Sequence, residues 1–171
     1  MKQKTISVTG LGYIGLPTAA LLASQGYNVL GTDISANAVE TINQGRIHIV
    51  EPDLDAFVRS AVTAGRLKAS TSPQAGDVYI ICVPTPFHEG GAIPQPNIDH
   101  VLAATRGIAP LVKPGDLVIL ESTSPVGTTE KMRDVLQEAS VRTDDVHMAY
   151  CPERVLPGKI MAELVENDRV V

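Results

Sequence analysis

Glu153 and Arg154 place a carboxylate and a guanidinium side by side, shortly after the moderately apolar segment 146–150. A carboxylate at the end of a strand can take a proton from water, and a guanidinium beside it can pair with an anion. Thr85 and Thr123 follow two strongly apolar segments, so their hydroxyls would also stand near strand ends. Threonines in such places are often plain turn residues, but together with Glu153 and Arg154 they form a candidate site if one sheet edge carries them all.

Gly10, Gly12 and Gly15 follow a short apolar segment and precede an amphipathic one. The spacing Gly-x-Gly-x-x-Gly between a strand and a helix is typical of a dinucleotide-binding loop. The first glycine permits a tight turn, the second lets a pyrophosphate approach the backbone, and the third lets the helix pack closely. The backbone N–H groups around Tyr13 and Ile14 would then face the phosphates at the helix N-terminus.

Asp33 lies 23 residues after Gly10, at the end of a second apolar segment. A carboxylate there can accept hydrogen bonds from both hydroxyls of an adenosine ribose, whereas it would repel a 2′-phosphate. The sequence therefore predicts NAD, not NADP, as cofactor. A glycine turn that binds nothing remains the alternative, but strand, helix and acid all stand where a dinucleotide site needs them.

The elements that must position these residues alternate along the chain between apolar strands and amphipathic helices. Several strands are apolar on both faces, as parallel strands covered by helices are. We therefore expect one α/β domain over residues 1–171, a Rossmann-type doubly wound parallel sheet with helices on both faces. The expected strands are 6–9, 27–32, 67–70, 77–83, 117–120 and 146–150, with residues 169–171 starting another, and the expected helices are 16–26, 35–45, 53–64, 98–108 and 128–139.

Composition narrows the classes of partner. The 171 residues are 44% hydrophobic and 19% charged, with a net charge of −5, which argues against nucleic acid or an anionic membrane as partner. No apolar run reaches the roughly 18 residues of a membrane span, and residues 1–4 do not open a signal peptide, so a cytoplasmic location is expected. Cys82 and Cys151 are the only cysteines and the four histidines are scattered, so neither a disulfide nor a metal site is expected. His48 and Glu51 are expected to form a surface pair.

Four motifs, taken in order, resemble the amino-terminal domain of the UDP-glucose/GDP-mannose dehydrogenase family, over all 171 residues. They are the glycine loop, the Pro84-Thr85-Pro86 loop, Glu121-Ser122-Thr123 followed by Pro-Val-Gly, and Pro152-Glu153 followed by Gly158. Residues 47–54 and 150–158 are similar to the branch that oxidises UDP-N-acetyl-D-mannosamine. UDP-glucose dehydrogenases usually carry Phe-Leu where this chain has Arg154-Val155, which weighs against UDP-glucose.

The resemblance implies an enzyme that oxidises the C6 alcohol of a UDP-sugar to a carboxylate and reduces two NAD in turn. The second oxidation needs a cysteine nucleophile, because a covalent thiohemiacetal must form. The family's Gly-Gly-x-Cys motif and its essential lysine belong to a carboxyl-terminal half, and neither occurs in this chain. We therefore expect a fragment that lacks the central helical segment and the substrate domain, is inactive alone, and forms a homodimer in the full-length enzyme.

The resemblance also assigns roles to residues. Pro84, Thr85 and Thr123 would contact the cofactor, the two threonines at its nicotinamide half. Thr123 and Glu153 match positions that hold the catalytic water, and Glu153 would be the base in thioester hydrolysis.

Arg154 would pair with the substrate's carboxamide or diphosphate, and Val155 would contact the substrate through its backbone. Three questions stay open: UDP-N-acetylglucosamine or UDP-glucose could be the substrate, the domain could be a stand-alone NAD-binding module without chemistry, and the stretch 88–97 could be a mobile lid or a plain loop.

Overall fold

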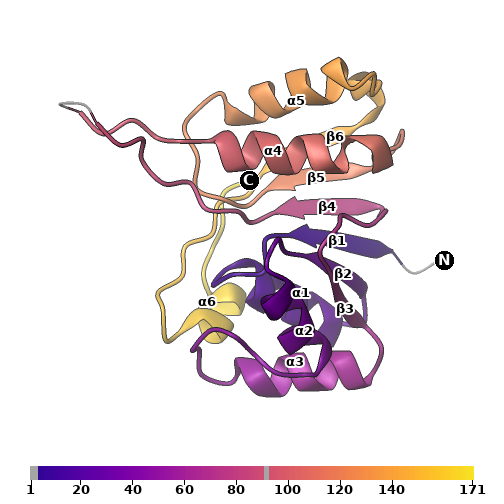
Figure 1. Ribbon diagram of the computed structural model, residues 1–171, viewed down its shortest axis with the longest axis vertical. Helices are drawn as coiled ribbons and strands as arrows, with labels where there is room; N and C mark the ends of the chain where they lie inside the picture. Colours follow the sequence, from indigo (N-terminus) through magenta and orange to yellow (C-terminus); the bar gives the residue numbers. More distant parts are fainter. Residues whose placement is uncertain (1–3, 91–92) are drawn as a thin grey trace.

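The computed structural model describes residues 4–90 and 93–171 (Figure 1). Within them, six parallel strands form one sheet: β1 (Thr5–Thr9), β2 (Asn28–Thr32), β3 (Leu67–Ser70), β4 (Val78–Ile81), β5 (Leu117–Leu120) and β6 (His147–Tyr150). Their order across the sheet is β3-β2-β1-β4-β5-β6. The chain thus runs from the centre to one edge, returns to the centre, and runs to the other edge, as in Rossmann folds.

Six helices are described in the same ranges, and two short 3₁₀ turns lie between α4 and β5 and between α5 and β6. Figure 1 shows α4 and α5 together near the β5–β6 end of the sheet, and α1, α2, α3 and α6 together near the β1–β3 end. The helices are α1 (Gly15–Ser24), α2 (Ala36–Asn43), α3 (Leu54–Thr63), α4 (Asp99–Ile108), α5 (Thr128–Glu138) and α6 (Ile160–Glu166), and the turns are η1 (Ala109–Leu111) and η2 (Thr143–Asp145).

Two hydrophobic clusters lie on opposite faces of the sheet, and β4 contributes side chains to both of them. Ile80 and Cys82 belong to the cluster under α1 and α3, whereas Tyr79 and Ile81 belong to the cluster under α4 and α5. Successive side chains of a strand point to opposite faces, so this alternation shows that β4 is covered on both sides. The predicted doubly wound parallel sheet is therefore confirmed.

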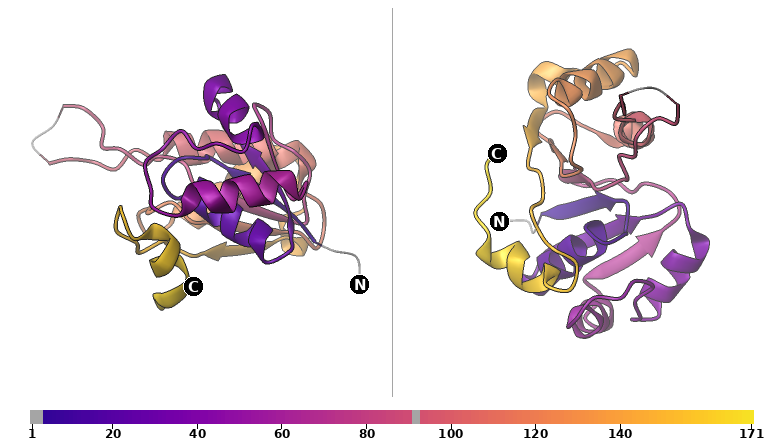
Figure 2. Two further views of the ribbon diagram at one scale, coloured as in Figure 1. Left: turned by 90° about the horizontal axis from the view of Figure 1, so that it is seen from below. Right: turned by 90° about the vertical axis from the view of Figure 1, so that its left-hand side faces the viewer.

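The end of the chain differs from the sequence-based expectation. Residues 169–171 form no strand, and the seven-residue helix α6 was not foreseen. Its buried residues are Ile160 and Met161, and the segment after β6 brings it against α1 (Figure 2). Seven residues are too few to show a clear helical period of apolar residues in the sequence. A helix of this length also has little stability of its own, so its formation depends on tertiary contacts.

Glu51 is the second correction, because it was expected on the surface beside His48. His48 is exposed, but Glu51 is buried, and its two carboxylate oxygens accept hydrogen bonds from the backbone N–H groups of Gly158 and Ile160, each at 2.7 Å. A buried carboxylate needs such donors. Glu51 therefore satisfies N–H groups at the start of α6 and ties the loop before α3 to that helix.

Residues 88–90 and 93–97, the described parts of the stretch 88–97, project away from the sheet between β4 and α4 (Figure 1). Phe87 and Pro96 pair across its base, and the His88 N–H donates to the Gln95 carbonyl at 2.8 Å. Residues 91–92 of this stretch lie outside the described residues, so the lid stays a prediction.

Candidate functional site

The glycine loop turns from β1 into α1 at the carboxyl end of the central strands. Gly10 has φ +90°, and a Cβ there would lie 2.3 Å from the Cys82 carbonyl oxygen. A Cβ on Gly15 would lie 1.8 Å from the Gly10 carbonyl oxygen, whereas one on Gly12 would meet nothing within 4 Å. Two of the glycines therefore allow close packing of strand and helix, and the third presents bare backbone to open space.

The start of α1 lies within that loop. Its N-cap residue, Ile14, provides no capping side chain, and Tyr13 beside it is exposed. Backbone N–H groups in the first turn of a helix have no partner within the helix, and the helix dipole adds positive potential there. This end of α1 is therefore suited to bind an anion such as a pyrophosphate.

Asp33 follows β2 and lies beside the glycine loop, as its position in the sequence predicted. Its Oδ2 accepts the Leu11 N–H at 2.9 Å, and its Oδ1 accepts the Ser35 N–H at 2.8 Å. Ser35 in turn caps α2, because its Oγ accepts the Ala38 N–H at 3.3 Å. The carboxylate is half-buried and held in place, and each of its oxygens retains a second lone pair for a ligand hydroxyl.

An apolar cavity of about 320 Å³ opens next to Asp33. Ile34 borders it and is 99% exposed, which is unusual for a large aliphatic side chain next to a buried strand. A flat heteroaromatic ring would cover such a surface, and the carboxylate at its rim would meet an attached ribose. Pro84, a predicted cofactor-binding residue, lines the same cavity as Asp33. The other lining residues are Thr9, Gly10, Thr32, Thr71, Pro73, Val83, His100, Ala103, Ala104 and Gly107.

The loops after β4 and β5 are joined by hydrogen bonds of hydroxyl groups. The Thr85 Oγ1 donates to the Thr123 carbonyl at 2.8 Å. Ser122, which sequence reasoning missed, accepts the Val83 N–H at 2.9 Å and donates to the Val83 carbonyl at 2.8 Å. The structure therefore brings Thr85 and Thr123 together, with Thr123 exposed and Ser122 holding the loops in register.

Glu153 lies beyond β6 on the same edge, and its side chain is only 5% exposed. Its Oε2 accepts the Val155 N–H, and its Oε1 lies 3.6 Å from the Arg169 guanidinium. Within residues 4–90 and 93–171, no hydrogen bond joins Glu153 to Thr123. Arg154 is exposed, and its carbonyl accepts a hydrogen bond from Asn167 at 2.7 Å.

Glu121, at the end of β5, is a buried carboxylate that sequence reasoning quoted within a motif but did not weigh. It is 3% exposed, and the Cys82 thiol donates to its Oε2 at 3.0 Å. Burial raises the pKa of Cys82 well above its ordinary value, and the nearby Glu121 charge raises it further. Cys82 is therefore a protonated thiol of the core. The available signal for Glu121 was its position directly after four apolar residues.

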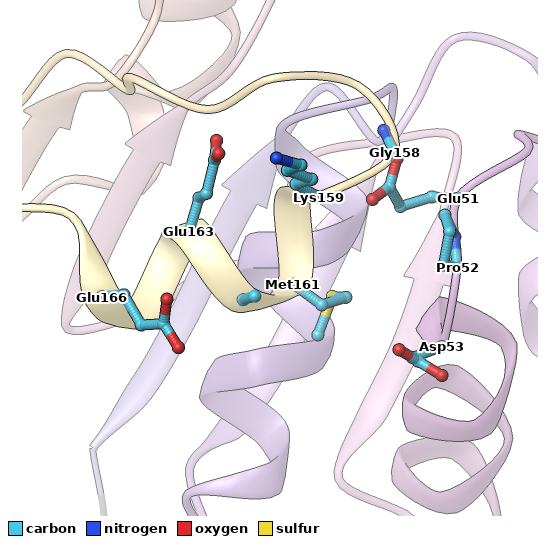
Figure 3. A pocket seen from close by; sticks show the side chains of 9 residues that line it. Glu51, Pro52, Asp53, Gly158, Lys159, Met161, Glu163 and Glu166 are labelled. Carbon is cyan, nitrogen blue, oxygen red and sulfur yellow. The ribbon is translucent and has the colours of Figure 1, made fainter.

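A second cavity, of about 280 Å³, lies between residues 51–53 and α6 (Figure 3). The Glu51 carboxylate points to Gly158 at its edge, and Lys159 and Met161 come from the start of α6. Residues 153–155 belong to the loop that ends at Gly158. Glu51, which lies about a hundred residues earlier in the sequence, therefore stabilises the end of that loop.

Two absences apply to the described part of the chain. It holds no cluster of three or more histidine, cysteine, aspartate or glutamate side chains arranged to bind a metal ion. Nor has any helix in it the length and apolar character needed to cross a bilayer.

Residues 4–171 match the family model for the NAD binding domain of the UDP-glucose/GDP-mannose dehydrogenase family. The chain belongs to this family. NAD is thereby confirmed as the cofactor of the domain, in agreement with Asp33 and the glycine loop.

Members of this family with curated functions are more than half identical to the chain. The UDP-N-acetyl-D-mannosamine dehydrogenase of Yersinia pestis is 55% identical over 180 residues, which cover 100% of the chain and 42% of the relative. The NDP-N-acetyl-D-galactosaminuronic acid dehydrogenase of Ralstonia nicotianae is 55% identical over 179 residues, covering 98% and 41%. The chain therefore spans about two fifths of the length of these relatives.

Solved structures of the family have the same fold. The UDP-N-acetyl-mannosamine dehydrogenase of Staphylococcus aureus superposes with a TM-score of 0.90 at 40% identity, over 96% of this chain and 40% of that one. The UDP-glucose dehydrogenase of Pyrobaculum islandicum superposes with a TM-score of 0.82 at 29% identity, over 97% and 39%.

Proposed function

We propose that this chain is the NAD-binding domain of a nucleotide-sugar 6-dehydrogenase that oxidises UDP-N-acetyl-D-mannosamine to UDP-N-acetyl-D-mannosaminuronate with two NAD. In this proposal the rest of the enzyme supplies the cysteine nucleophile, the lysine and the homodimer contacts. The carrying observation is Glu153, a nearly buried carboxylate on the sheet edge that also carries the glycine loop. A cytoplasmic location and the absence of nucleic-acid and membrane partners belong to the same proposal.

The choice of sugar rests on Arg154-Val155 and on the relative from Yersinia pestis. A second candidate is an NDP-N-acetylgalactosamine substrate, because the Ralstonia nicotianae relative is equally similar. The rates of NADH formation by the full-length enzyme with each of the two sugars, compared under the same conditions, decide between them.

The residues present fit the dinucleotide. Gly12 leaves the space that a pyrophosphate needs, Asp33 is fixed for the adenosine ribose, and the cavity beside Ile34 suits the adenine ring. In this proposal Thr85 and Thr123, whose loops are joined by a hydrogen bond between them, contact the nicotinamide half. When bound at these residues, NAD would supply the hydride acceptor for the oxidations at the sugar C6, with one NAD used in each.

The chain's own contribution to the chemistry is hydrolysis of the thioester that the second oxidation produces. Glu153 takes a proton from the water that attacks the thioester carbon, and the exposed Thr123 helps to hold that water. Arg154, which is exposed, and the backbone of Val155 contact the UDP-sugar. Thioester formation does not require Glu153.

The test is Glu153→Gln in the full-length enzyme. Hydrolysis should slow by at least about 10²-fold, the usual contribution of a positioned base, while thioester formation continues. Mass spectrometry after mixing with substrate and NAD should then show protein carrying a covalent sugar-nucleotide adduct. Glu138→Gln, an exposed change on α5, is the matched control. Turnover at the parent rate without an adduct would remove Glu153 from the mechanism.

A further inference from the structure

Arg169 connects two buried carboxylates at the carboxyl edge of the sheet. One guanidinium nitrogen, Nη1, lies 3.0 Å from Glu121 Oε1, and the other, Nη2, lies 3.6 Å from Glu153 Oε1. The side chains of Glu121 and Glu153 are 3% and 5% exposed, and that of Arg169 is 23% exposed. Nη1 also lies 3.8 Å from the Cys151 sulfur.

The charges of this cluster depend on Arg169. Removing a carboxylate from water is costly unless a cation or several donors compensate it, and here one guanidinium faces two carboxylates. Burial alone would lower the pKa of Arg169, but its bonds to Cys151 and Glu121 outweigh burial and raise that pKa, so it stays charged. A guanidinium has donors in a fixed planar fork, which lets one side chain contact two acceptors at a set separation.

Glu121 holds the guanidinium in place. Its Oε1 accepts both the Arg169 hydrogen bond and one from the Thr18 hydroxyl of α1 at 3.3 Å. Glu121, which anchors Arg169, is thereby connected to α1, the helix whose N-terminus faces the dinucleotide phosphates. The position of Arg169 is therefore set relative to the cofactor site as well as to β5.

The two oxygens of Glu153 have different surroundings. Oε2 is occupied by the Val155 N–H, whereas Oε1 has no hydrogen-bond partner among the described residues. At 3.6 Å the guanidinium attracts Oε1 without a hydrogen bond of normal length. Oε1 is therefore a buried oxygen whose lone pairs are not used by any hydrogen bond among the described residues, and it faces the guanidinium.

We propose that Arg169, anchored on Glu121, is a positioning residue that orients Glu153 Oε1 toward the hydrolytic water. The inference rests on the proposed function of Glu153. In the assisted step, the water oxygen forms a bond to the thioester carbon, and one water proton moves to Glu153 Oε1. The bond between carbon and sulfur then breaks, and the carboxylic acid and the cysteine thiolate are released.

The experiment separates formation of the covalent adduct from its hydrolysis in the full-length enzyme, by single-turnover kinetics with mass spectrometry. Arg169→Met should slow hydrolysis by at least about 10-fold and leave adduct formation within about 2-fold of the parent. Arg169→Lys, which keeps the charge but not the fork, should restore part of the rate. Arg142→Met, which removes an exposed arginine paired with Asp145, is the matched control and should change neither step.

A double-mutant cycle distinguishes positioning from a general structural role. If Arg169 acts through Glu153, adding Arg169→Met to Glu153→Gln should change hydrolysis by less than about 2-fold. The same 10-fold loss in both backgrounds, or an equal loss in both steps, would overturn the inference. NAD affinity, measured by calorimetry, should stay within about 2-fold of the parent in every variant.

The remaining outcomes are also decisive. If Glu153→Gln accumulates adduct and Arg169→Met turns over at the parent rate, only the Arg169 inference fails. If Glu153→Gln itself has no effect, the proposed base and this inference fail together. Should Arg169→Met not fold, Glu121→Gln decides in its place, because loss of the anchor should slow hydrolysis by at least about 3-fold and leave adduct formation unchanged.

Discussion

Glu51 makes the sharpest stability prediction, because its carboxylate has two hydrogen-bond partners that are both distant in sequence. The N–H groups of Gly158 and Ile160 donate to separate oxygens at 2.7 Å, in a side chain removed from water. A hydrogen bond to a charged group contributes about 1.5–3 kcal/mol. Glu51→Ala removes two such hydrogen bonds and leaves two N–H groups without their acceptor. We therefore expect the free energy that holds α6 on the domain to fall by about 3–5 kcal/mol.

That loss is comparable to what attaches α6 to the body of the domain. Its buried side chains, Ile160 and Met161, contribute about 1.5–3 kcal/mol each. The loss caused by removing the Glu51 carboxylate therefore cancels most of the free energy gained by burying these two side chains. As a result, α6 should detach and unfold locally before the sheet unfolds. Glu51→Gln should give an intermediate effect of about 2–4 kcal/mol, since the amide keeps one acceptor and turns its NH₂ group toward the other donor.

Two measurements test this prediction. Hydrogen–deuterium exchange followed by mass spectrometry should show faster exchange confined to residues 154–166, and urea denaturation should show a smaller loss of global stability than of local protection. Glu138→Gln, on the exposed face of α5, should match the parent in both. Parent-like exchange of Gly158 and Ile160 in Glu51→Ala, with stability within about 0.5 kcal/mol, would refute the reasoning.

Two further predictions concern the cofactor and alkaline pH. Asp33→Asn should narrow the preference of the chain for NAD over NADP by about 1–3 kcal/mol in calorimetry, because a charged hydrogen bond to the ribose is lost; equal affinity of the parent for both would contradict this. The raised pKa of Cys82 means that the folded state keeps a proton that the unfolded chain releases above about pH 9.0. The contribution of the Cys82 thiol to the free energy of unfolding is complete below this pH and is lost as the pH rises toward the folded pKa. The free energy of unfolding of the parent should therefore fall by up to about 1.4 kcal/mol per pH unit more than that of Cys82→Ala. Parallel denaturation curves of the two proteins between pH 9 and 11 would count against it.

The sheet could be predicted from sequence because its determinants are local. Apolar segments of strand length alternate with amphipathic ones, and the Gly10 turn together with the Asp33 carboxylate marks the first crossover. Five helices were expected within one or two residues of their observed ends. The site residues at strand ends followed in the same way, since parallel strands deliver them to one edge.

The contacts of those residues could not be predicted. Glu51 pairs with Gly158 across 107 positions and Arg169 with Glu121 across 48, so no local pattern indicates either partner. An acid in a loop is usually solvated, which made Glu51 a surface residue by expectation. The position of Glu153 was predicted, but Thr123 was expected as its neighbour, whereas the structure provides Arg169.

The packing of α6 against α1 also has a consequence for the order of folding. Bonds such as Thr18 to Glu121 and Glu51 to Gly158 close loops of more than a hundred residues, and contacts of such sequence separation form late because loop closure is entropically costly. The glycine loop and Asp33, by contrast, are joined across 22 residues. A chain emerging from the ribosome can therefore form the contact between the glycine loop and Asp33 early, whereas Glu153 and its loop become ordered only when the last helix has docked.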